Sequence, residues 1–263
     1  MIVTLTTDFG SRDHYAATLK GRILCAAGEV CLVDITHHIN TYDIVAAAYT
    51  LRNCYRSFPH GTVHIVIVDN YYDEQVELIA VQHGGYYFLL PDNGLLSLII
   101  DTVSPEAAYH LPRRSEGTKG GIKQRFANAV AHIAAAQPFA EIGIPAHDLV
   151  QRIALQPVVS KDQIKGCIIH IDNYENCILN ITRESFSIFQ IDQPFHLYFK
   201  RNNPITKLSE HYQDAPIGET LCRFNSAGYL EIAVNMGKAA TLLGLNVEDT
   251  VQLIFNSEPI MVN

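Results

Sequence analysis

Two aspartates near the amino terminus, Asp8 and Asp13, are of a type and spacing that could bind a ligand. The apolar run from Ile2 to Leu5 stops at a glycine turn, and the pattern that follows predicts a helix from about residue 13. In open α/β sheets, ligands bind beside the carboxyl ends of strands. Two carboxylates there would repel a phosphate, but they could accept hydrogen bonds from a vicinal diol. The structural alternative is that Asp13 caps the helix and Asp8 holds the turn.

Polar residues also follow two later apolar runs. Asp69 ends the run 63–68, which is largely apolar on both faces, as expected of a central strand in a covered sheet. A carboxylate at the end of such a strand faces the ligand crevice. Asn93 lies in the segment 91–96, where Asn-Gly supplies the positive φ that a tight turn needs. A plain structural turn is the commoner explanation for these residue types.

Histidine and cysteine are common, but their spacing does not favour a metal site. Of the twelve histidines, His37 and His38 are adjacent and would face opposite ways on a strand, while His60 and His64 run from a loop into a strand. None of the six cysteines forms a C-x-x-C pair, and most lie in apolar runs. We therefore expect buried, reduced thiols, no metal and no cofactor.

Composition excludes several classes of protein. The chain has 263 residues, of which 48% are hydrophobic and 17% charged, which suits a folded chain with a substantial core. The formal net charge of -8 argues against a nucleic-acid partner, because a phosphate backbone requires a basic surface. No apolar run approaches the roughly 20 residues that span a bilayer, and the amino terminus lacks the basic start of a signal peptide. We expect a cytoplasmic protein with no membrane partner.

The two halves of the chain show different periodicities. In the first half, expected strands at 2–6, 31–35, 63–68, 78–82 and 86–90 alternate with helices near 13–27, 42–57 and 123–136, the second of them capped by Asn40 or Thr41. This alternation predicts an α/β domain with a sheet flanked by helices. In the second half, short strands are expected at 167–171, 177–182, 195–199, 219–224, 229–234 and 250–255. They predict an antiparallel β-barrel-like domain. The predicted domains are residues 1–157 and 158–263.

Several motifs occur together in a recognisable order. TDFG, followed by VDITHHI, GTVHIVIVD, PDNGLL and NSAGYLEIAVN, runs from Thr7 to Asn235. This order resembles the S-adenosylmethionine (SAM) hydroxide adenosyltransferase family, which is related to the SAM-dependent fluorinase and chlorinase. The resemblance implies attack of water on the ribose C5′ of SAM, giving adenosine and methionine. It also implies a trimer in which each site lies between the amino-terminal domain of one subunit and the carboxyl-terminal domain of a neighbour.

The resemblance assigns roles to residues in both halves. Asp8 and Asp13 would hold the ribose, Asp69 would orient the water, and the turn around Asn93 would shape the crevice. In the second half, Asp172 and Ser226 match residues that contact the methionine part, Asn176 matches one that binds the adenine edge, and Asn235 fits the family pattern, as does Glu231. SAM or adenosine would be the small-molecule ligand.

The chain departs from the family at two positions of the water-orienting trio. Val76 stands at the position of the family's arginine, with Glu77 replacing a neighbouring arginine, and the segment 121–124 has no histidine. Cations on Lys119, Lys123 or Arg125, or the imidazoles of His83 or His110, are candidate substitutes. The family's turn glycine is also replaced, by Glu175. Two rival hypotheses therefore stay open: a catalytically silent SAM or adenosine binder, and an enzyme that uses another nucleophile or nucleoside.

Overall fold

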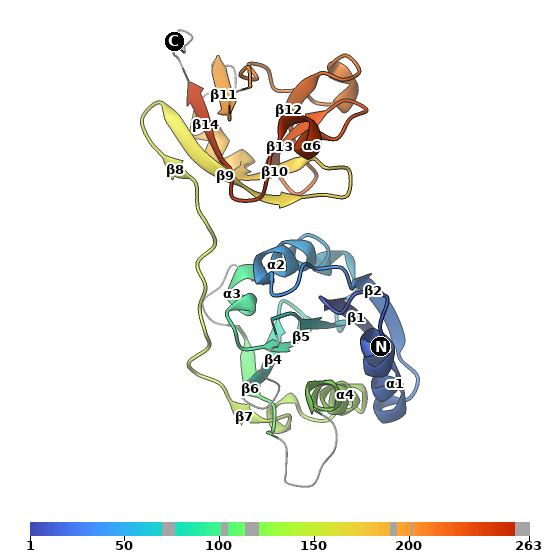
Figure 1. Cartoon of the computed structure of the whole chain (residues 1–263). Coiled ribbons are helices and arrows are strands. Elements are labelled where there is room, and N and C mark those ends of the chain that lie inside the picture. Colours follow the sequence, from blue (N-terminus) through green and yellow to red (C-terminus); the bar gives the residue numbers. More distant parts are fainter. Residues whose placement is uncertain (70–76, 101–104, 114–120, 190–193, 201, 256–263) are drawn as a thin grey trace. The chain divides into compact units, whose positions relative to one another are not determined.

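The computed structural model describes the whole chain except residues 70–76, 101–104, 114–120, 190–193, 201 and 256–263 (Figure 1). The chain forms two compact units, Met1–Ala154 and Leu155–Asn263. Residues 146–157, around this division, contain no helix or strand. Each unit has a hydrophobic core of its own.

The first unit is built on a seven-stranded sheet in the order β2-β1-β3-β5-β4-β6-β7. The strands are β1 (Ile2–Thr7), β2 (Cys31–Thr36), β3 (Val63–Ile67), β4 (Leu78–His83), β5 (Tyr86–Pro91), β6 (Ala107–His110) and β7 (Ile144–Pro145). Strands β2, β1, β3 and β5 are parallel, and β4 is antiparallel to both β5 and β6. Strands β1, β2, β3, β5 and β6 therefore end at the same side of the sheet, which we call the carboxyl edge.

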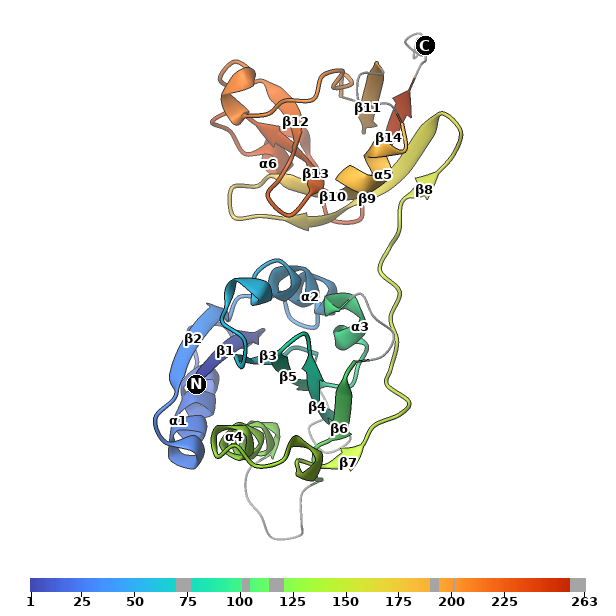
Figure 2. The same ribbon diagram turned by 180° about the vertical axis from the view of Figure 1, so that it is seen from behind.

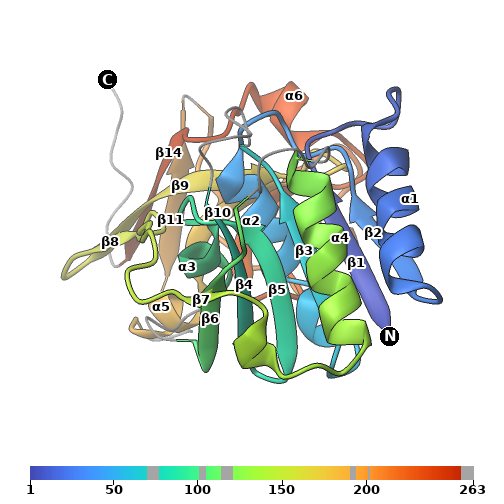
Figure 3. The same cartoon turned by 90° about the horizontal axis from the view of Figure 1, so that it is seen from below.

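Helices cover both faces of this sheet, as the alternating sequence pattern predicts (Figures 1 and 2). Helices α1 (Tyr15–Ala27) and α4 (Gly121–Ala134) pack on one face, shown nearest the viewer in Figure 3. Helices α2 (Ile44–Arg52) and α3 (Leu95–Ile99) pack on the other. Successive strand residues point to opposite faces, so Ile65 and Ile67 join the core under α1 and α4, while Val66 joins the core under α2 and α3.

Both predicted helix caps in this unit are wrong. Helix α1 begins at Tyr15 after a bend through residues 11–14, and its N-cap residue, His14, makes no side-chain capping bond. Asp13 is exposed within that bend and does not cap the helix. Helix α2 is capped by Asp43, whose side chain accepts the Ala46 N–H at 2.8 Å. It ends at Arg52 and is followed by the 3-10 turn η1 (Tyr55–Ser57); a second such turn, η2 (Phe139–Glu141), precedes β7.

The second unit is a curled antiparallel half-barrel, which confirms the predicted fold class. Its strands are β8 (Val158–Val159), β9 (Gln163–Ile171), β10 (Cys177–Thr182), β11 (Phe195–Phe199), β12 (Thr220–Phe224), β13 (Tyr229–Val234) and β14 (Thr250–Phe255). The order is β11-β14-β9-β10-β13-β12, with β8 on β9. The long strand β9 produces the curl, because its first half pairs with β14 and its second half with β10. Short helices α5 (Arg183–Ser187) and α6 (Ala239–Leu243) and the turn η3 (Tyr212–Asp214) complete the unit.

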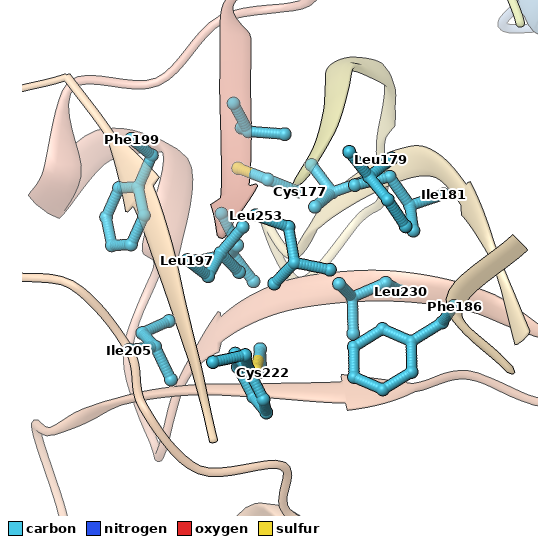
Figure 4. Packing of buried hydrophobic residues seen from close by; sticks show 14 of the residues in the cluster. Cys177, Leu179, Ile181, Phe186, Leu197, Phe199, Ile205, Cys222, Leu230 and Leu253 are labelled. Carbon is cyan, nitrogen blue, oxygen red and sulfur yellow. The ribbon is translucent and has the colours of Figure 1, made fainter. Parts of the chain in front are cut away.

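Aliphatic and aromatic side chains fill the interior of the half-barrel, as Figure 4 shows for a cluster that includes Leu179, Phe186, Leu197, Leu230 and Leu253. Cys177 and Cys222 lie in this core, where burial raises the pKa of each thiol to about 12. All six cysteines are free. The prediction of buried thiols is wrong for Cys25 and Cys31, which are exposed.

Within the part of the chain that the structure describes, every helix is too short or too polar to cross a membrane.

Candidate functional site

The carboxyl edge contains the point at which the strand order reverses. From β1 the chain passes through α1 to β2 on one side, and from β2 it passes through α2 to β3 on the other side of β1. Because α1 and α2 cover opposite faces, the ends of β1 and β3 flank a topological switch point, where open α/β sheets bind their ligands. Asp8 directly follows β1, and Asp69 lies just beyond β3.

Asp8 and Asp69 are brought into contact by this arrangement. The Asp69 backbone N–H donates to Asp8 Oδ2 at 3.5 Å, and the Tyr42 backbone N–H donates to the same oxygen at 3.3 Å. Tyr42 and Asp69 both have left-handed backbones, with φ of 68° and 57°. Such conformations are costly for residues with a Cβ, so the two bonds to Asp8 help to hold both loops.

One oxygen of the Asp8 carboxylate stays available. Among the described residues, its hydrogen bonds involve Oδ2, and none reaches Oδ1. The half-buried Asp69 carboxylate likewise makes no hydrogen bond or ion pair within that part of the chain. Within the described residues, the switch point therefore presents two carboxylates with free acceptor capacity, on residues joined by the bond from the Asp69 N–H to Asp8.

Asn93 supports this edge from the next strand. Its Nδ2 donates to the Val68 carbonyl at 3.3 Å, and its Oδ1 accepts the Leu95 N–H at 3.2 Å. Gly94 has a φ of 93°, which confirms the positive φ expected at Asn-Gly. Since both ends of the Asn93 amide bond to the protein, the residue ties the β5 turn to the segment that carries Asp69.

Asp13 is not joined to this group. It is exposed in the bend before α1, and the structure describes no contact between it and Asp8. A role in ligand binding for Asp13 stays a prediction from the sequence.

The two candidate cations that the structure describes, Lys123 and Arg125, are engaged by other groups. Lys123 Nζ, from the first turn of α4, lies 5.0 Å from the ring centres of both Phe9 and Tyr15, which places a positive charge over the loop next to Asp8. Arg125 donates to the carbonyls of Leu111 and Pro112, at 3.0 Å each. Lys119 and Val76 lie outside the described residues.

Glu77 and the candidate imidazoles divide between the two edges of the sheet. Glu77 forms an ion pair with Arg113, which follows β6. His110, at the end of β6, lies at the carboxyl edge near Asp92; burial raises the pKa of the Asp92 carboxyl, although the Val150 N–H and the charge of His110 oppose the rise. His83 ends the antiparallel strand β4 and so lies at the opposite edge, which removes it from the site.

In the second unit, Asp172 and Asn176 close the turn between β9 and β10. Asp172 Oδ1 accepts the N–H groups of Tyr174 and Asn176 at 2.9 and 2.8 Å, and its Oδ2 accepts Asn176 Nδ2 at 3.0 Å. Asn176 is buried, whereas Tyr174 is exposed. The two residues that the resemblance assigns to the methionine and adenine parts are therefore direct neighbours.

The glutamate that replaces the family's turn glycine keeps the turn conformation. Glu175 has a φ of 63°, in the left-handed region that favours glycine. Its carboxylate binds Lys238 Nζ at 2.9 Å and the Thr241 N–H at 3.1 Å, while its carbonyl accepts the Ala240 N–H at 2.9 Å. Together the Thr241 and Lys238 hydrogen bonds outweigh burial and lower the pKa of the Glu175 carboxyl. The contacts with α6 stabilise a turn that the sequence change alone would disfavour.

A buried carboxylate lies beside this turn, on β13. Glu231 accepts a hydrogen bond from the Tyr212 hydroxyl at 2.7 Å and lies 3.5 Å from an Arg223 guanidinium nitrogen. Burial raises the pKa of Glu231, helped by the charge of Asp172 and opposed by Tyr212 and Arg223. Sequence reasoning missed Tyr212 and Arg223. Arg223 lies directly opposite Glu231 in the β12–β13 hairpin. This neighbour relation depends on the strand register, which the sequence does not show.

The remaining predicted residues lie on loops of the half-barrel. Ser226 is exposed in the β12–β13 turn, where Asn225 Oδ1 accepts the N–H groups of Ala227 and Tyr229. Asn235 Nδ2 donates to the Ala215 carbonyl at 2.8 Å, so its side chain holds the loop before β12.

Other features of the described chain do not compete with this site. Two open hollows of about 490 and 630 Å³ run along α1 and α4, and neither is lined by a predicted site residue. Within the described residues, His, Cys, Asp and Glu side chains form no group of three or more that could hold a metal ion.

The fold defines a protein with an α/β unit, whose carboxyl edge is the candidate site, and an antiparallel β unit in one chain. Residues 3–143 match the model of the SAM hydroxide adenosyltransferase N-terminal domain, and residues 166–252 match the model of its C-terminal domain. The chain belongs to the SAM hydroxide adenosyltransferase family.

Relatives of known name cover nearly the whole chain. The sequence is 26% identical to an (R)-S-adenosyl-L-methionine hydrolase of Methanocaldococcus jannaschii, over 97% of this chain and 96% of that protein. It is 26% identical to a fluorinase of an Actinoplanes species, over 95% of this chain and 96% of that protein. A crystal structure of an uncharacterized conserved protein from Thermotoga maritima superposes with a TM-score of 0.84 at 25% identity, over 97% of this chain and all of that one. The family resemblance drawn from the motifs is thereby confirmed.

Proposed function

We propose that this protein binds SAM and hydrolyses it to adenosine and methionine. The observation that carries the proposal is the pair formed by Asp8 and Asp69 at the switch point of the sheet, where the described residues leave acceptor capacity free on both carboxylates. The hydrolase and fluorinase names of the relatives support an enzyme that acts on the C5′–sulfur bond of SAM.

The two carboxylates suit different steps of this reaction. Asp8 Oδ1 would accept hydrogen bonds from the ribose hydroxyls, and Asp69 would hold the attacking water. As the water oxygen bonds to C5′, the C5′–sulfur bond breaks and its electron pair returns the sulfonium to the neutral thioether of methionine. The water releases one proton, which Asp69 can accept or pass to solvent. Because the sulfonium is already a good leaving group, alignment and exclusion of bulk water are the main requirements.

The second unit would bind the rest of the ligand. Asp172 and Ser226 would contact the methionine part, Asn176 would bind the adenine edge, and Asn235 would shape the same end of the half-barrel. We propose that a trimer brings these residues of one subunit to Asp8 of another. Neither a metal nor a cofactor is needed, because the sulfonium activates C5′ itself.

A catalytically silent SAM or adenosine binder is the second candidate, and specific observations favour it. Near the position at which the family's histidine is expected, Ile122 is buried in the core and Lys123 packs over two aromatic rings. Glu77, in place of an arginine, pairs with Arg113. Of the water-orienting trio, Asp69 alone is retained. The charged groups described near the other two positions are Lys123 and the Glu77–Arg113 ion pair.

Incubation with SAM separates the candidates. The hydrolase predicts that chromatography detects adenosine and methionine in equal amounts, at a rate that does not depend on chloride or fluoride. Isothermal titration that shows SAM binding without any product would identify the silent binder. A product that appears only with added halide, and that is not adenosine, would show that the nucleophile is not water.

A further inference from the structure

His37 contacts the segment that carries Asp8 at two points. Its imidazole Nδ1 lies 2.8 Å from Thr7 Oγ1, and its backbone carbonyl accepts the Gly10 N–H at 2.6 Å. Thr7 and Gly10 are the residues on either side of Asp8 and Phe9. His37 is itself buried, with 9% of its surface exposed, so both contacts are protected from water.

Asp34 and Lys20 continue this contact on the other side of the imidazole. His37 Nε2 lies 3.1 Å from Asp34 Oδ1, which is close enough for an ion pair although not aligned for a hydrogen bond. The other oxygen of Asp34 accepts a hydrogen bond from Lys20 Nζ at 2.6 Å. The row of Thr7, His37, Asp34 and Lys20 thus connects α1 and β2 to the end of β1.

This support matters because Asp8 is otherwise loosely held. The two backbone bonds to Asp8 Oδ2, at 3.3 and 3.5 Å, are at the long limit for N–H···O bonds. The contacts of His37 are much shorter. Thr7 Oγ1 also accepts the Phe9 N–H at 3.3 Å, so the same hydroxyl links the imidazole to the backbone just after Asp8.

We infer that His37 is a positioning residue, which acts through Thr7 to fix the Asp8 carboxylate for the vicinal hydroxyls of a nucleoside. This inference rests on the proposed function, since it takes Asp8 as the group that binds the ribose. His37 does not touch the ligand in this scheme. Loss of its imidazole removes the contact with Thr7 and lets the segment that carries Asp8 shift, so that the hydroxyl–carboxylate bonds weaken while contacts to the base stay as they were.

The test compares adenosine with 2′,3′-dideoxyadenosine, which lacks both hydroxyls, in titrations of the full chain. His37→Phe keeps a ring but removes both nitrogens, and Thr7→Val removes the hydroxyl at nearly constant volume. Each variant is expected to bind adenosine about three- to tenfold more weakly, the effect of losing roughly one hydrogen bond. Each should bind dideoxyadenosine as the unchanged protein does. The double variant should bind adenosine no more weakly than Thr7→Val alone, because Thr7→Val already breaks the contact with His37.

The chain offers a matched control in Thr4 and His64. Thr4 Oγ1 lies 2.7 Å from His64 Nδ1, in a second buried Thr–His pair between β1 and β3 that does not contact the segment 7–10. Thr4→Val with His64→Phe should leave adenosine affinity unchanged.

Three results would overturn the inference. They are unchanged adenosine affinity in folded Thr7→Val, an equal loss for both nucleosides, or the same loss in the Thr4 and His64 control. Failure of the unchanged protein to bind adenosine would instead overturn the proposed function.

Discussion

Replacing Asp8 by asparagine tests the ribose-binding role with little change of shape. The side-chain oxygen of asparagine can keep the two backbone N–H bonds from Tyr42 and Asp69, because both bonds reach a single oxygen of Asp8. The amide NH₂ then takes the place of Oδ1, which no described residue contacts. A ribose hydroxyl that found an acceptor there would meet a donor instead.

The magnitude follows from this geometry. A hydrogen bond to a charged group contributes about 1.5–3 kcal/mol, so Asp8→Asn should weaken adenosine binding by about 10- to 150-fold. The free energy of unfolding should change by less than about 0.5 kcal/mol, because the bonds of the protein to the side chain remain. Asp8→Ala should lose the same binding energy and, in addition, about 1 kcal/mol of stability, since two long hydrogen bonds disappear.

Isothermal titration with adenosine measures the first quantity, and urea denaturation measures the second. 2′,3′-Dideoxyadenosine is the control ligand, for which the unchanged protein and Asp8→Asn should have similar affinities. If folded Asp8→Asn bound adenosine as tightly as the unchanged protein does, Asp8 would not hold the ribose, and the switch point would not be the ribose site.

Three further outcomes are expected. Asp69→Asn should lower SAM turnover by about 10²–10⁴-fold while SAM affinity stays nearly constant, because the amide keeps the shape but cannot take the proton of the water. If the variant turned SAM over at the unchanged rate, another residue would hold the nucleophile. Light scattering should give three times the chain mass of 29.3 kDa, and a monomer that binds ligand at micromolar concentration would contradict the shared site. Burial lowers the pKa of His64 to about 4, so below its ordinary pKa of about 6.5 the unfolded chain binds a proton that the folded chain does not. The free energy of unfolding should therefore fall by up to about 3 kcal/mol as the pH drops from about 6.5 to about 4. In Thr4→Val with His64→Phe, this fall should disappear from the plot of unfolding free energy against pH. An unaltered plot would show that other groups cause the fall.

Strand ends were predictable from the sequence because they depend on local pattern. The apolar runs before Asp8 and Asp69 end within two residues of the ends of β1 and β3, and β3 has the fully buried character expected at the centre of a covered sheet. The short helix α3 and the short strand β6 were not predicted, since neither has enough residues to show a period. The start of α1 was also misjudged, because the cap is a histidine that makes no capping bond.

Contacts between distant segments explain what the sequence could not reveal. Glu175 is tolerated in a turn that favours glycine because Lys238 and the backbone of α6, more than sixty positions along the chain, bind its carboxylate. Lys123 similarly gains its place over Phe9 only because α4 packs beside α1. The contact of the His37 imidazole with the Thr7 hydroxyl depends on the pairing of β1 with β2. Each of these contacts follows from tertiary packing rather than from local periodicity.

The source of the oxygen in the product tests the central claim most directly. The protein is incubated with SAM in water enriched in ¹⁸O, and the products are analysed by mass spectrometry. Attack of water on C5′ predicts adenosine that carries one ¹⁸O atom at its 5′ hydroxyl, together with unlabelled methionine. Adenosine without the label, or SAM that binds and is recovered intact, would contradict hydrolysis at the Asp8 and Asp69 site.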